Sequence, residues 1–144
     1  MGGLGSVVVY QGQHQTRFGL AEVVSQPPRD LWNCAACIEP LAGGHRNQAW
    51  RTRGLAQELV FKSTTRGEVA LEWLGPVQDV ARRCGFVVPQ MLRSASGRYV
   101  DAGWTCETFV EGEVVPREGL ADVAVLLTSF HAQTQGWLQR PEFL

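Results

Sequence analysis

The stretch "PLAGGHRNQAWRTRGLAQELVFKSTTRG", residues 40–67, decides the fold of this chain. It opens with a glycine pair and a polar tip, and the apolar run Leu59 to Phe61 ends on Lys62. Short apolar runs separated by turn residues predict strands over residues 38–41, 48–52 and 57–62, with a glycine turn after the first. Strands that follow one another in this way favour an antiparallel meander.

The period of the apolar residues changes after Lys62. Helical spacing relates Val69, Trp73, Val77, Val80 and Cys84. The sequence therefore predicts a helix that Gly85 ends, with a kink or a break into two abutting helices at Gly75-Pro76.

The flanking segments supply the remaining elements. Asp30 is expected to cap a short helix over Leu31 to Cys37. Further strands are expected over residues 87–92, with Pro89 at an edge, and in a hairpin that turns at residues 101–103. A last helix is expected from Glu118 to about Thr134, with one stripe formed by Leu120, Val123, Ala124, Leu127, His131 and Thr134. The predicted fold class is α+β: an antiparallel sheet of about five strands, one main helix packed on it, and a C-terminal helix.

Composition excludes several classes of function. The chain has 144 residues, which favours one domain, and its formal net charge of −1 gives no electrostatic case for nucleic acid or an anionic membrane. The start lacks the pattern of a signal peptide, and no apolar run approaches the roughly 18 residues of a membrane span. We therefore expect a cytoplasmic protein with a loosely structured lead-in over residues 1–29.

The spacing of two cysteines is that of half a zinc site or of a redox motif. Cys34 and Cys37 form one C-x-x-C pair, but Cys84 and Cys106 do not form a second. Two thiols fill only half of a tetrahedral zinc site. We interpret the pair as buried structural thiols that bind no metal, with a zinc or redox domain as the weakest alternative.

Lys62 carries the main functional signal of the sequence. An ammonium that closes an internal strand is costly unless it meets an anion. A glycine turn just upstream lets backbone N–H groups approach a ligand closely. Together these features suggest a phosphate clamp, in which Glu72, or alternatively Glu68, holds the lysine in place. The pattern is neither a Walker A motif nor a Rossmann fingerprint.

The same residues carry a family resemblance. They lie in "LAGGHRNQAW", "ELVFK", "EWL", "GFVVPQMLRSASGRYVDAGWTCETFVEG" and "LLTSFHA", from about Ile38 to His131. Here the chain resembles the N-terminal lobe of the aminoglycoside phosphotransferase superfamily, whose fold is that of the protein kinases. It looks closest to small actinobacterial phosphotransferase-like proteins.

The resemblance implies a role for each matching residue. Gly43, Gly44, His45, Arg46 and Asn47 match the hairpin that covers the nucleotide. Lys62 matches the lysine on the α- and β-phosphates of ATP, and Glu72 matches the helix glutamate that orients it, with Glu68 as the alternative. Thr108, Phe109 and Val110 match the hinge whose backbone meets the adenine edge.

The departure from the family is equally informative. The family uses an H-x-D-x-x-x-x-N loop and a later metal-binding aspartate, which in the full-length family hold Mg²⁺. Here the last aspartate is Asp122, and His131 is followed by Ala132 and Gln133. We therefore expect an N-lobe over residues 30–112 that is truncated before the catalytic loop. Residues 113–144 would be a linker and the first helix of an absent C-lobe.

Two functions follow as expectations. The first is a nucleotide-binding lobe of an ATP-dependent small-molecule phosphotransferase, inactive alone, with no catalytic residue and no metal ligand of its own. The alternative is a non-catalytic binding or regulatory lobe. It would dock to a partner, to the missing lobe or to a second copy through residues 118–144.

Overall fold

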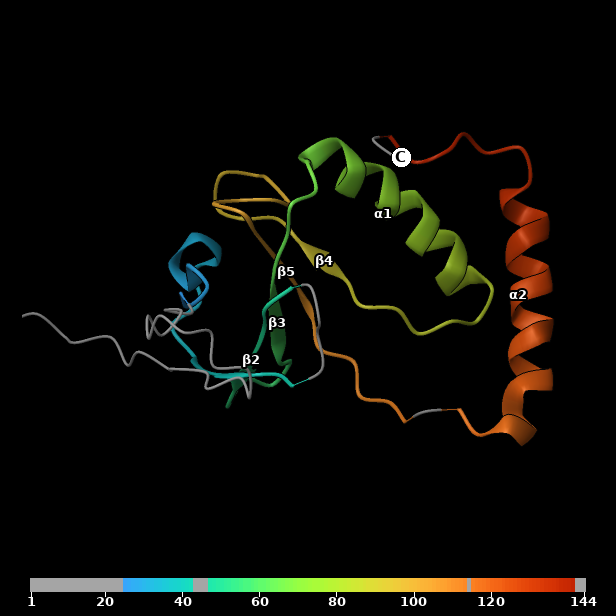
Figure 1. Ribbon diagram of the computed structural model, residues 1–144, viewed down its shortest axis with the longest axis horizontal. Helices are drawn as coiled ribbons and strands as arrows, with labels where there is room; N and C mark the ends of the chain where they lie inside the picture. Colours follow the sequence, from blue (N-terminus) through green and yellow to red (C-terminus); the bar gives the residue numbers. More distant parts are fainter. Residues whose placement is uncertain (1–24, 43–46, 114, 142–144) are drawn as a thin grey trace, which may run out of the picture.

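The computed structural model describes residues 25–42, 47–113 and 115–141. This part of the chain forms one five-stranded antiparallel sheet with helices beside it (Figure 1). The strands are β1 (Cys37–Pro40), β2 (Ala49–Arg53), β3 (Leu59–Ser63), β4 (Met91–Leu92) and β5 (Trp104–Thr108), in the order β1-β2-β3-β5-β4. The helices are the 3-10 helices η1 (Arg29–Trp32) and η2 (Arg117–Gly119) and the α-helices α1 (Glu68–Arg83) and α2 (Leu120–Thr134). The predicted α+β class with a five-stranded antiparallel sheet is confirmed.

One face of the sheet carries an aromatic core. Its buried residues are Trp32, Trp50, Phe61, Trp104 and Cys106. Alternation along the strands places them together, because Phe61 lies opposite both Trp50 on β2 and Cys106 on β5. Trp32 covers this face from η1, with its ring edge-on to Phe61 at 5.8 Å and its indole N–H donating to the Leu92 carbonyl at 3.1 Å. Each such aromatic side chain removes about 150–250 Å² from water, so this cluster dominates the packing of the sheet.

The opposite face is covered in part by α1. Ala70 and Leu71 of the helix are buried with Met91 of β4, and Leu74 packs against them. The helix is continuous from Glu68 to Arg83 with Pro76 inside it, so the prediction of two abutting helices is wrong.

The short helix before β1 also differs from the prediction. It spans only Arg29–Trp32, and Asp30 lies inside it and makes no capping bond. Asn33, in a left-handed conformation with φ of 52°, ends the helix. Cys37 therefore begins β1 instead of ending a helix.

Between α1 and β5 the chain makes less sheet than predicted. Only Met91 and Leu92 pair as β4, and the Pro89 carbonyl accepts a hydrogen bond from Arg82 on α1 at 2.8 Å. The predicted turn after Asp101 is confirmed. Positive φ at the two central residues, 47° at Ala102 and 78° at Gly103, matches a type I′ hairpin.

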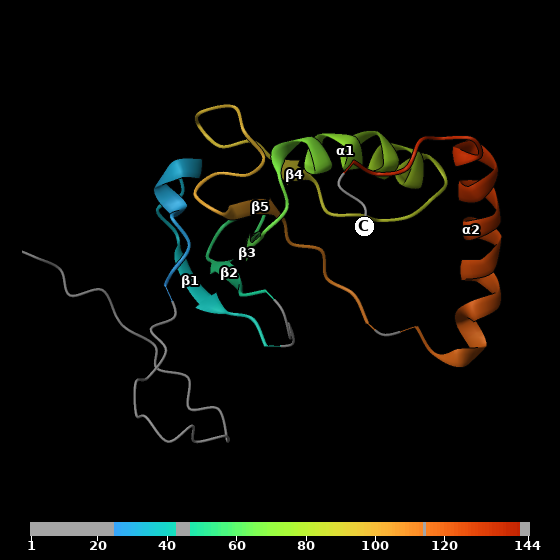
Figure 2. The same ribbon diagram turned by 45° about the horizontal axis from the view of Figure 1, so that its top comes forward.

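Helix α2 lies beyond α1, which stands between it and the sheet (Figures 1 and 2). Phe130 of α2 meets Phe86 edge-on at 6.4 Å, and Gln133 donates to the Cys84 thiol at 3.3 Å. Along the predicted stripe, Val123 and Thr134 are half-buried, whereas Leu120, Ala124, Leu127 and His131 are exposed. Leu126 and Phe130, which the predicted stripe omitted, are half-buried instead.

Candidate functional site

A pocket of about 300 Å³ opens where α1 meets the sheet face opposite the aromatic core. Its polar and charged lining residues are Asn47, Lys62, Ser63, Thr64, Arg66, Tyr99, Thr105 and Glu107. Its apolar lining residues are Leu71, Leu74, Met91 and Cys106. The pocket lining therefore combines apolar side chains with two cations and one carboxylate.

Lys62 reaches this pocket because of its place in the strand. It is the only lysine in the chain. Alternation along β3 puts Phe61 into the aromatic core and Lys62 on the opposite face. Its side chain is 46% exposed, so the ammonium is reachable by a solvent-borne ligand. Lys62 therefore lines the pocket on the α1 side of the sheet.

The carboxylate that meets Lys62 is Glu107 of β5. The ion pair predicted between Lys62 and Glu72 is absent, and Lys62 does not pair with Glu68 either. The sequence did contain a signal for Glu107: in "WTCET", residues 105 and 107 alternate with the buried Trp104 and Cys106. A carboxylate on the same face as a strand-ending lysine is a candidate partner for it.

The two glutamates of α1 lie beside the segment before β5. Glu68 accepts hydrogen bonds from the backbone N–H groups of Tyr99 and Val100, both at 2.7 Å. Arg93 lies 3.7 Å from Glu68 and 3.9 Å from Glu72, with its guanidinium 4.0 Å from the centre of the Tyr99 ring. Glu68 therefore anchors the first turn of α1, and Glu72 belongs to this anchor.

The predicted hinge residues do not line the pocket. The N–H of Thr108 donates to the Gln90 carbonyl at 2.9 Å, and its hydroxyl accepts from the Gln90 N–H at 2.8 Å. The N–H of Phe109 donates to the Glu58 carbonyl at 2.7 Å. These backbone groups are satisfied within the chain, so they are not presented to an adenine edge. The structure shows no contact of Val110 with the pocket.

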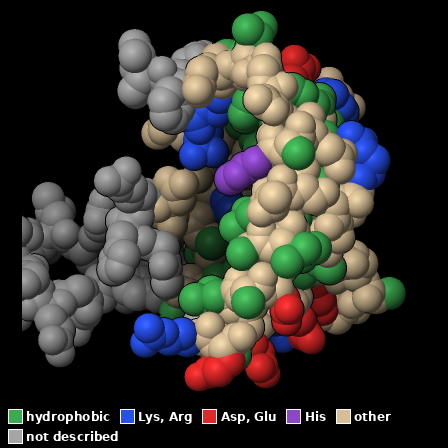
Figure 3. Space-filling view, turned by 90° about the vertical axis from the view of Figure 1, so that its right-hand side faces the viewer, with side chains coloured by type: hydrophobic (Ala, Val, Ile, Leu, Met, Phe, Trp, Pro, Cys, Tyr) green, Lys and Arg blue, Asp and Glu red, His purple; other side chains and the backbone are tan. Residues whose placement is uncertain are grey.

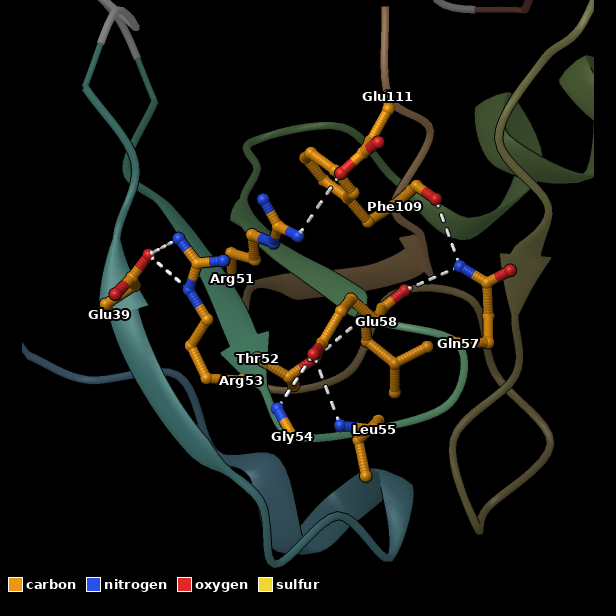
Figure 4. Close-up of polar contacts among 11 residues, drawn as sticks. Glu39, Arg51, Thr52, Arg53, Gly54, Leu55, Gln57, Glu58, Phe109 and Glu111 are labelled. Atoms are coloured by element: carbon orange, nitrogen blue, oxygen red, sulfur yellow. Dashed lines mark hydrogen bonds and ion pairs between the residues drawn. The ribbon is translucent and has the colours of Figure 1, made fainter.

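A polar cluster on the β2–β3 hairpin contacts Phe109 and Glu111, which follow β5 (Figure 4). The Gln57 side chain donates to the Phe109 carbonyl at 3.0 Å. The Arg51 guanidinium lies 3.7 Å from the centre of the Phe109 ring and 4.0 Å from Glu111. The carboxylate of Glu58 closes the hairpin loop through the N–H groups of Gly54 and Leu55 and the hydroxyl of Thr52.

The glycine turn of the predicted phosphate clamp falls mostly outside the described residues. Gly43, Gly44, His45 and Arg46 lie outside them, and only Asn47 is described. Asn47 is exposed and lines the pocket, one residue before Gln48, whose N–H donates to the Ser63 hydroxyl at 2.8 Å. Arg66, which sequence reasoning missed, lines the same pocket from the loop before α1.

The cysteines take separate positions. Cys37 is exposed at the start of β1, so the prediction that both thiols of the pair are buried is wrong. Cys34 is half-buried against the aromatic core. Cys106 is buried within that core, and its burial raises the pKa of its thiol to about 12. Over the described ranges, no three His, Cys, Asp or Glu residues are grouped so as to hold a metal ion.

Over the same ranges, no helix is both long enough and apolar enough to cross a bilayer. No family model, no curated protein and no solved structure matches the chain.

Proposed function

We propose that this chain is a kinase-like N-terminal lobe that binds the phosphates of a nucleoside triphosphate in the pocket beside α1. The observation that carries the proposal is the position of the only lysine, which closes β3 on the pocket face. Arg66 adds a second cation to the same lining. The ammonium of a lysine can donate charge-assisted hydrogen bonds to phosphate oxygens.

The chain offers more contacts to the phosphates of ATP than to its adenine base. The phosphate end meets Lys62 and Arg66. The base end would meet the hinge, where the N–H groups of Thr108 and Phe109 already donate to carbonyls of the chain. We therefore propose that recognition rests on the phosphates, while the adenine contributes little.

Lys62→Ala tests this proposal. We expect the affinity for ATP to fall by about tenfold or more, because a hydrogen bond to a charged group contributes about 1.5–3 kcal/mol. Isothermal titration calorimetry measures the Kd. The matched control is Arg117→Ala, which removes a cation from η2 outside the pocket lining and should bind as the wild type. Equal binding by the Lys62→Ala variant, or no binding of ATP to the wild type at millimolar concentration, would refute the proposal.

We further propose that the lobe does not transfer phosphate by itself. Phosphoryl transfer requires a base and metal-binding carboxylates in addition to a lysine on the phosphates. No aspartate follows Asp122 in this sequence. Incubation of the pure protein with ATP, Mg²⁺ and hydroxylated small molecules should yield no phosphorylated product above background. Steady turnover that Lys62→Ala abolishes would contradict this.

A second candidate function is supported by α2. None of its residues is buried, and apolar side chains gather in patches on the face that Figure 3 shows. We propose, as the alternative, a docking lobe that uses residues 118–144 to bind a second copy.

A further inference from the structure

The register of β3 and β5 brings Lys62 and Glu107 together. Lys62 lies opposite Thr105, and Glu107 is two residues further along β5 on the same face. Such diagonal neighbours are within reach of two long side chains. The ammonium of Lys62 donates to the Glu107 carboxylate, and both residues line the pocket. The contact is therefore fixed by the sheet itself.

Glu107 is the better fixed member of the pair. Its side chain is 17% exposed, against 46% for Lys62. β5 lies between β3 and β4 in the sheet, so the backbone of Glu107 is held on both sides. A lysine side chain is long and flexible, and a well-held carboxylate restricts where its ammonium can go.

The two glutamates of α1 have other partners. Both oxygens of Glu68 accept backbone N–H groups of the segment before β5, and Glu72 lies 3.9 Å from Arg93. Neither pairs with Lys62. A movement of α1 would therefore break its own anchor without changing the partner of the lysine.

We propose that Glu107 positions Lys62 for a phosphate, and that the orientation of the lysine is set inside the sheet independently of α1. The role in phosphate binding rests on the proposed function; the pairing does not. An ammonium has three N–H donors. With one directed at Glu107, the others remain for ligand oxygens in the pocket.

The pairing is tested by ¹⁵N NMR relaxation of the lysine ammonium group. Because the chain has one lysine, the side-chain signal needs no assignment. In Glu107→Ala the order parameter of the ammonium should fall, and in Glu107→Gln, which keeps the shape and an acceptor oxygen, it should fall less. The matched control Glu72→Ala removes the same atoms from α1 and should leave the value unchanged. A backbone amide spectrum of each variant establishes that it is folded.

The positioning role is tested by ATP titration of the same variants. Glu107→Ala should weaken binding by about fivefold or more, which corresponds to about 1 kcal/mol. Glu107→Gln and Glu72→Ala should stay within about twofold of the wild type.

Tighter binding by Glu107→Ala would show that Glu107 competes with phosphate, and would overturn the positioning role. An ammonium mobilised by Glu72→Ala, or left ordered by Glu107→Ala, would overturn the pairing. A wild type with an ordered ammonium and no affinity for ATP would refute the proposed function and the positioning role but leave the pairing intact.

Discussion

Single carboxylates organise this protein at the residue scale, and Glu58 is the clearest case. Its side chain accepts from the Thr52 hydroxyl and from the N–H groups of Gly54 at 2.8 Å and Leu55 at 3.2 Å. These hydrogen bonds, that of Thr52 first, hold the pKa of Glu58 below its usual 4.5. The carboxylate thus stands in for a backbone acceptor where the chain turns between β2 and β3.

The pKa of Glu58 predicts how stability depends on acid. Because the pKa is lower in the folded state, the contribution of Glu58 is fully present above the unfolded value of 4.5 and is lost as the pH falls through the folded value. Glu58→Gln should therefore lower the free energy of unfolding at pH 7, and the difference from the wild type should shrink below pH 4.5. Urea denaturation between pH 7 and pH 3 measures both. Glu118→Gln, at an exposed position in η2, is the control, and an equal effect there would contradict the assignment.

The contribution of Cys106 to stability should depend on pH in the opposite direction to that of Glu58. Burial raises the pKa of its thiol to about 12, above the ordinary value of 9.0. As the pH rises through 9, the thiol ionises in the unfolded chain but not in the folded one, so the contribution of Cys106 to stability declines.

In the native protein a thiol reagent should modify the exposed Cys37 rapidly and Cys106 only on unfolding. Mass spectrometry of the labelled peptides checks this, and early labelling of Cys106 would show that the core opens locally.

At the scale of elements, the ends of α1 show what a sequence can predict. The stop at Gly85 was predictable because the residue after a helix often needs a positive φ, and Gly85 has a φ of 102°. Its N–H donates to the Arg82 carbonyl and that of Phe86 to the Ala81 carbonyl, which is the hydrogen-bond pattern of a Schellman motif. The signal is local, so neither the sheet nor α2 is needed to read it.

The continuity of α1 through Pro76 rules out the break into two helices that was one of the two predicted alternatives, and the reason is also local. Proline disfavours the α conformation of the residue before it, because the proline Cδ clashes with the N–H and the Cβ of that residue. Gly75 has no Cβ, so the Cβ part of this clash is absent, which favours a continuous helix. The partner of Lys62 was missed for a different reason, since Glu107 lies 45 residues further along the chain and is brought to Lys62 by the pairing of β3 and β5.

Gly85→Ala tests the end of α1. The substitution forces an unfavourable φ and places a Cβ 3.3 Å from Leu126 of α2, so it should cost about 1–2 kcal/mol of unfolding free energy. Urea denaturation measures the loss. Gly112→Ala is the control, because a Cβ there meets nothing within 4 Å, and it should change stability by less than about 0.5 kcal/mol. Equal effects of the two substitutions would show that the Gly85 conformation adapts.

At the scale of the whole molecule, the unusual feature is how little α2 is covered. Leu126 and Phe130 face the end of α1, as the contacts with Gly85 and Phe86 show. The Trp73 indole also donates to the Leu138 carbonyl at 3.3 Å, which ties the segment after α2 to α1. Helical periodicity predicts an apolar stripe on α2. It cannot predict which side of α2 packs against α1, because that depends on the path of the chain between β5 and α2.

The uncovered side of α2 predicts self-association. Leu120 is 54% exposed and Leu127 is 41% exposed, one above the other along the helix. Removal of such apolar area from water stabilises a dimer at about 25 cal/mol per Å² before the entropic cost of association. We therefore expect concentration-dependent association at tens of micromolar in sedimentation velocity, and Leu127→Glu should reverse it. The matched control Ala132→Glu adds the same charge at an exposed site away from this stripe and should leave association unchanged. A wild type that sediments as a monomer throughout, or equal dissociation by both variants, would show that the stripe does not bind a second copy.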